Sequence, residues 1–164
     1  MRFIDIRNGL GKSFCDYLLT GDETFKRRYL TLEVPPEFLP YAEGRRFFYK
    51  TFEGAFADFI PARGIEDVVF LGKALNNLGY YFEAHEVVEK FWLNYEGDFK
   101  KFLQALIQVS IANLHLEGGN QKGYLRLRKS ALKNLNGFGG WLFGINLPRL
   151  KEELTSAEGY LTVW

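Results

Sequence analysis

The side chains best suited to chemistry lie on one short stretch of the chain, residues 80–93. At about 100° per helical residue, His85 and Glu89 fall one turn apart on an arc shared with Phe82 and Trp92. Glu83 is expected on the opposite, solvent-facing side. A carboxylate among large apolar groups is costly unless it is paired, hydrogen-bonded or bound to a metal. We therefore expect His85 and Glu89 to form a buried pair or to ligate one metal ion together.

The next helical segment, residues 99–117, supplies further polar side chains on a mostly apolar pattern. Gln104, Gln108 and His115 fall within one stripe, at offsets of four and eleven residues from the first. If this stripe faces the helix that carries His85, both histidines of the chain meet at one point. The glutamines would then be hydrogen-bond partners of the pair, or would line a ligand pocket together with Trp92.

A metal at this point would be held by His85, Glu89 and His115, with Glu86 or water as a fourth ligand. Such donors suit a divalent ion such as zinc, manganese or iron. If the site is catalytic, Glu86 is also the candidate general base. The Glu-x-x-His signature of di-iron bundles is absent because Phe82 stands three residues before His85. The zincin signature is absent too, because position 89 is a glutamate.

Helices must position these side chains, and hydrophobic periodicity predicts them clearly over residues 63–164. We expect helices over residues 65–78, 80–95, 99–117, 121–135 and about 148–156, with Gly79 and Asn120 among the residues that end or cap them. Short linkers between long helices predict an antiparallel, all-α bundle. We expect residues 1–62 to form an N-terminal extension with two helices, packed on the bundle, and alternation at residues 30–34 predicts one short strand.

Composition narrows the function classes. The 164 residues contain one cysteine and two histidines, which excludes a disulfide framework and a three-histidine metal site. With 21 basic and 20 acidic side chains, the chain has no overall charge that would attract a polyanion, and nucleic acid is not expected as a partner. Uncharged stretches reach only about fifteen residues, fewer than a membrane helix needs. We expect a soluble, cytoplasmic protein, with homo-oligomerisation left open.

Several blocks of sequence resemble one known family. They are Gly79–Glu86, Glu89 with Trp92, Phe102–Gln108, His115, and Gly119 with Asn120, all within Asn77 to Leu135. In this order they are similar to domain of unknown function 309, a family of small helical proteins with a His-x-x-x-Glu-x-x-Trp/Tyr motif. His85, Glu89 and Trp92 meet that motif. The resemblance implies an all-helical fold whose motif binds metal, with no established activity.

Two functions remain open on the sequence alone. The first is a helical protein that binds a metal ion or a small polar ligand through His85, Glu89 and His115. The alternative is a non-enzymatic helical interaction module in which the His–Glu pair is a structural, buried network. Residues 78–84 resemble the first helix of a tetratricopeptide-type repeat. The sequence about 34 residues further on matches it only weakly, so an array of such repeats is not expected.

Overall fold

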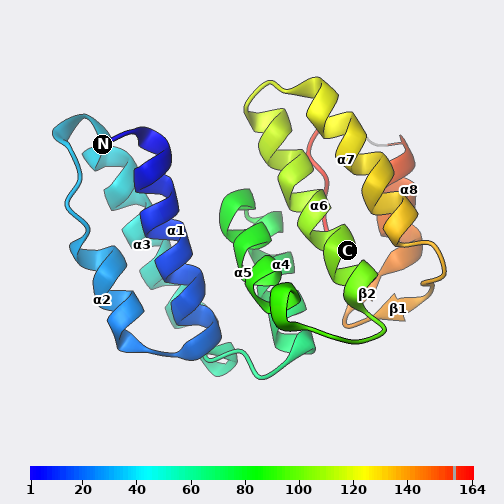
Figure 1. Cartoon of the computed structure of the whole chain (residues 1–164), viewed down its shortest axis with the longest axis horizontal. Helices are drawn as coiled ribbons and strands as arrows, with labels where there is room; N and C mark the ends of the chain where they lie inside the picture. The colour runs from blue at the N-terminus through cyan, green and yellow to red at the C-terminus, as the bar shows by residue number, and fades with distance from the viewer. Residues whose placement is uncertain (157) are drawn as a thin grey trace. The chain divides into compact units, whose positions relative to one another are not determined.

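The computed structural model describes residues 1–156 and 158–164, and these residues contain eight α-helices and one two-stranded hairpin. The backbone divides into two compact units, Met1–Arg63 and Gly64–Trp164. The all-α prediction is therefore confirmed (Figure 1). Among the described residues, none of the helices is both long and apolar enough to cross a membrane.

The first unit contains α1 (Phe3–Thr20), α2 (Glu23–Thr31) and α3 (Leu39–Ala55). Its core is aromatic: the Phe14 ring stacks on Tyr49 with ring centroids 4.0 Å apart and meets the rings of Tyr29 and Phe52 edge-on. All four rings are buried. Edge-to-face and offset ring pairs of this kind add to the free energy of apolar burial.

The strand predicted at residues 30–34 is wrong, and a helix was missed beside it. Asp22 caps α2 by accepting a hydrogen bond from the Thr24 amide at 2.8 Å. Arg46 of α3 donates to the carbonyls of Tyr29 (3.0 Å) and Leu32 (2.5 Å), which satisfies groups at the end of α2. These contacts from outside the segment outweigh its alternating pattern.

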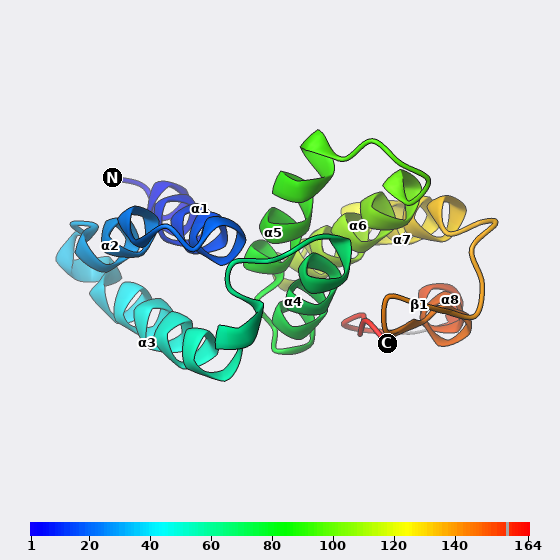
Figure 2. The same cartoon turned by 90° about the horizontal axis from the view of Figure 1, so that it is seen from below.

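The second unit is a series of helices in which consecutive members pack against each other (Figure 2). They are α4 (Ile65–Asn77), α5 (Tyr81–Asn94), α6 (Lys100–Glu117), α7 (Gln121–Asn134) and α8 (Leu147–Ser156). The hairpin of β1 (Trp141–Leu142) and β2 (Ile145–Asn146) is antiparallel and precedes α8. All five helices lie where the sequence places them, within one or two residues at most ends.

Gly72 sets how closely α4 approaches α5, the helix that carries His85. A Cβ at this position would lie 2.6 Å from Val88 Cγ2, well inside van der Waals contact. Both residues are buried, so little room exists for Val88 to move aside. The absence of a side chain at Gly72 therefore helps to fix the position of α5.

We expect Gly72→Ala to lower the free energy of unfolding by about 1–3 kcal/mol, because the added methyl group overpacks the α4–α5 contact. Gly44→Ala is the control: Gly44 lies within α3, a Cβ there meets nothing within 4 Å, and the free energy of unfolding should rise by about 0.5–1 kcal/mol. Urea denaturation measures both. Equal stability of Gly72→Ala and the unmodified chain would contradict the close approach.

Candidate functional site

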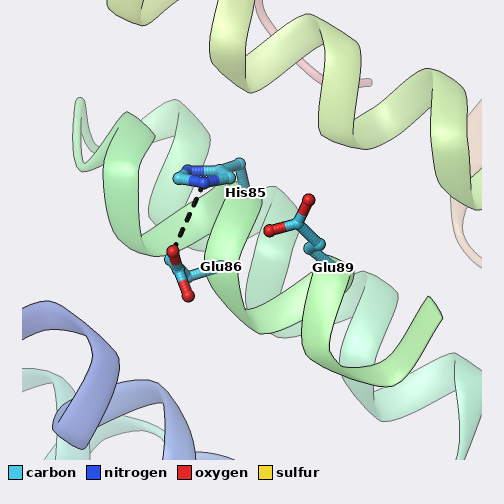
Figure 3. Close-up of side chains that lie close together, drawn as sticks. All are labelled: His85, Glu86 and Glu89. Carbon is cyan, nitrogen blue, oxygen red and sulfur yellow. Dashed lines mark ion pairs between the residues drawn. The ribbon is translucent and has the colours of Figure 1, made fainter. Parts of the chain in front are cut away.

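Helix α5 brings His85, Glu86 and Glu89 together (Figure 3). Each offers one ligand atom, and these atoms all lie within 4.8 Å of one another. The spacing i, i+1 and i+4 places them on adjoining parts of one helical surface. Helical geometry alone therefore sets the mutual distances in this His–Glu–Glu group.

His85 and Glu86 contact each other directly. His85 Nε2 lies 3.5 Å from Glu86 Oε1, and the side chains are only 12% and 8% exposed. The ring of Phe82 packs edge-on against the imidazole, with centroids 5.1 Å apart. The contact is an ion pair when the imidazole is protonated. Such a pair is weakly screened because water reaches it poorly.

Glu89 lies one turn beyond His85 and is only partly buried. Of the two carboxylates in the group, Glu89 therefore has more access to solvent than Glu86. The sequence predicts a pair of His85 with Glu89, whereas Glu86 is the carboxylate that the structure places in direct contact with the imidazole. A side chain at i+1 usually points away from residue i, which is why the sequence favoured Glu89 over Glu86 as the partner.

Glu83 is fully buried, although a single amphipathic face for residues 80–93 predicts it on the solvent side. That prediction is wrong. The buried residues of α5 occupy consecutive positions, 82–84 and 86–88, so burial covers more than one face of the helix. α5 packs against α4 and against α6, and one apolar stripe does not describe a helix with neighbours on two sides.

Trp92 links the end of α5 to the start of α6. Its indole Nε1 donates to the carbonyl of Lys100 at 3.1 Å, and Lys100 Nζ lies 4.3 Å from the centre of the indole ring. Lys100 also donates to the carbonyls of Trp92 and Tyr95. These contacts close the connection between the two helices. A role for Trp92 in a ligand pocket stays a prediction.

Two members of the polar stripe on α6 make contacts with α7 or its cap. Gln108 Oε1 accepts a hydrogen bond from Asn134 Nδ2 at 2.9 Å. His115 Nδ1 lies 3.0 Å from Nδ2 of Asn120, the residue that caps α7. A Cβ on Gly123 would lie 2.9 Å from the His115 ring, so the imidazole packs against the first turn of α7.

His115 is not in the close group that His85 forms among the described residues, and its role as a metal ligand stays a prediction. The same holds for Gln104, which is half-buried on α6, and for Gln108 as a residue near a ligand. The structure thus brings together the part of the predicted site that lies on α5.

The fold and the site together define a class of protein: all-helical, with a histidine and two carboxylates grouped on one helix. The profile of the family described as Domain of unknown function (DUF309) matches residues 70–127, which include α5, α6 and the His–Glu–Glu group. The family resemblance found in the sequence is thereby confirmed for this segment, which is less than half of the chain. No curated protein and no solved structure matches the chain.

A double-mutant cycle on His85→Ala and Glu86→Gln measures the coupling between these side chains. We expect a coupling free energy of about 1–3 kcal/mol near pH 5.5, where the imidazole is charged most readily, and less near pH 8.5. Thermal or urea unfolding of the four proteins gives the value. A coupling that does not depend on pH would show that the contact is not an ion pair.

Proposed function

We propose that this protein binds a divalent metal ion through His85, Glu86 and Glu89 on α5. The single observation that carries the proposal is the convergence of one imidazole and two carboxylates within 4.8 Å on a largely buried helix surface. Carboxylates in such surroundings are costly unless a cation or hydrogen bonds compensate them. A metal ion compensates both at once.

The donor set indicates the class of metal. One nitrogen and two oxygens suit zinc, manganese or iron(II), whereas a site for calcium would consist of oxygens alone. Three protein ligands leave at least one coordination position for water or a small polar ligand. No reaction is assigned. If one exists, Glu86 is the candidate for a general base when it does not ligate the metal.

His115 is the remaining candidate for a fourth ligand. Its Nδ1 contacts Asn120, and only Nε2 remains for a metal. A hydrogen bond to one ring nitrogen commonly orients a histidine whose other nitrogen ligates. The helix-cap contact and the packing on Gly123 also account for this residue without a metal. The proposal therefore rests on the three residues of α5.

We expect protein purified without an affinity tag to contain about one equivalent of zinc, manganese or iron, because the group offers three donors to one ion. Elemental analysis measures the content. In chelator-treated protein, adding the cognate metal at about 100 times its Kd should stabilise the fold by about 2.7 kcal/mol, seen as a rise in Tm. Absence of metal together with an unchanged Tm for all three ions would overturn the proposal.

Glu89→Gln tests the proposed metal site most directly, because Glu89 is only partly buried and glutamine preserves the size of its side chain. We expect it to lose at least about tenfold in metal affinity while the fold is retained, since an anionic ligand is replaced by a neutral one. Glu96→Gln, at an exposed acid just beyond α5, is the matched control and should bind as the unmodified chain does. Isothermal titration of each variant gives the affinities.

His115→Ala decides whether α6 contributes a ligand. We expect unchanged metal affinity in the same titration, because His115 stands apart from the group on α5. A loss equal to that of Glu89→Gln would instead place His115 among the ligands, as the sequence predicts.

A further inference from the structure

The last residues of the chain, Tyr160–Trp164, lie in an extended conformation against α4 and α6 (red in Figure 1, behind α6). Side-chain amides hold most of the segment, and at its last residue the backbone amide of Asn146 in β2 donates to the carbonyl of Trp164 at 2.9 Å. We call the surface that holds them the amide groove. It is formed by Asn76 and Asn77 of α4 together with Asn113 of α6.

Two asparagines of the amide groove each bind both main-chain groups of one residue. Asn113 Nδ2 donates to the carbonyl of Leu161 at 2.8 Å, and the Leu161 amide donates to Asn113 Oδ1 at 2.6 Å. Asn77 binds Val163, two residues further along the segment, in the same way. Its Nδ2 donates to the carbonyl of Val163 at 2.7 Å, and the Val163 amide donates to its Oδ1 at 2.8 Å. The two side chains thus act as the edge of a strand does toward an added strand.

Behind this contact lies a second layer of buried polar groups. Asn76 Nδ2 donates to the Leu161 carbonyl at 3.0 Å, while its Oδ1 accepts from Ser110 at 3.2 Å and from Asn113 at 3.0 Å. Asn76, Ser110 and Asn113 are at most 3% exposed. Buried amides require partners, so the groove is built to have a polypeptide main chain in it.

The segment's side chains alternate as those of a bound strand do. Leu161 and Val163 are each 2% exposed, whereas Tyr160 is 52% exposed and stacks on Tyr81 of α5 with centroids 5.3 Å apart. The intervening Thr162 amide donates to Glu153 Oε1 of α8 at 2.6 Å. The segment is therefore held by main-chain hydrogen bonds and by the burial of two apolar side chains spaced two residues apart.

We propose that the amide groove is a peptide-binding site for an extended segment with apolar residues at alternate positions, and that residues Tyr160–Trp164 are its occupant in cis. Every residue except proline can form the same main-chain hydrogen bonds. The groove therefore selects a segment by its extended backbone and by its two apolar side chains. A second polypeptide with such a segment fits the same contacts when the chain's own segment leaves.

The test uses the chain truncated after Glu158 and the fluorescently labelled peptide Gly-Tyr-Leu-Thr-Val-Trp, which reproduces residues 159–164. We expect saturable binding by fluorescence anisotropy. A second peptide, Gly-Tyr-Ile-Ser-Leu-Trp, keeps the pattern with other residues and should bind within about tenfold of the first. A third, with serine at both apolar positions, should bind at least about tenfold more weakly, because each substitution removes a buried apolar side chain.

Groove variants test the contacts themselves. Asn77→Ala removes two hydrogen bonds to Val163 and should weaken peptide binding by about tenfold or more. Asn94→Ala, at an exposed asparagine that ends α5, is the matched control and should bind as the truncated chain does. The full-length chain should bind the peptide at least about tenfold more weakly than the truncated chain, because its own segment competes.

If the truncated chain does not fold, a protease site inserted between the exposed residues Glu158 and Gly159 replaces truncation. The chain is folded, cut, and then mixed with labelled peptide, which should exchange with the cut segment. The proposal is overturned if folded, truncated or cut protein binds no peptide, if only the chain's own sequence binds, or if Asn77→Ala binds as tightly as Asn94→Ala.

Discussion

The second unit depends on one buried amide, the side chain of Asn76. It links three parts of the chain that are distant in sequence: α4, on which it lies, α6 through Ser110 and Asn113, and the C-terminal segment through the Leu161 carbonyl. In the protein interior these hydrogen bonds are hardly screened, and a missing partner would leave a buried polar group unsatisfied. The network therefore specifies one arrangement of α4 and α6, where apolar packing alone would tolerate several.

The position of α5 follows from that arrangement. α5 packs against both α4 and α6, Gly72 allows it close to α4, and Tyr81 at its start stacks on Tyr160 of the C-terminal segment. The packing of the whole second unit thus buries His85 and Glu86, whereas the geometry of one helix sets the distance between them. The amide groove and the His–Glu–Glu group are thus separate features of the second unit that depend on the same packing of α4, α5 and α6.

Sequence patterns predicted α4 to α8 because periodicity and caps are local: Gly79 ends one helix, and Asn120 caps another by accepting from the Gly123 amide at 2.9 Å. The same patterns could not predict the amide groove, whose hydrogen bonds join residues 48 and 86 positions apart. The position of Asn76 and Asn113 within mostly apolar helices is the one sequence feature that indicates buried polar contacts there. In the first unit, α2 was missed because Arg46 stabilises its end from another helix.

The sequence placed the candidate ligands His85 and Glu89 on the helix that is α5, and the structure adds the direct contact of Glu86 with the imidazole. The ion pair of His85 with Glu86 requires a protonated imidazole, whereas ligation of a metal requires a neutral one. If the protein binds a metal ion as we propose, protonation of His85 and ligation of the ion by its imidazole exclude each other. For such a site, acid favours the ion pair and higher pH favours the bound metal. The structural pair and the proposed metal site are then alternatives at one imidazole, and a structural role for His85 does not by itself exclude the proposed function.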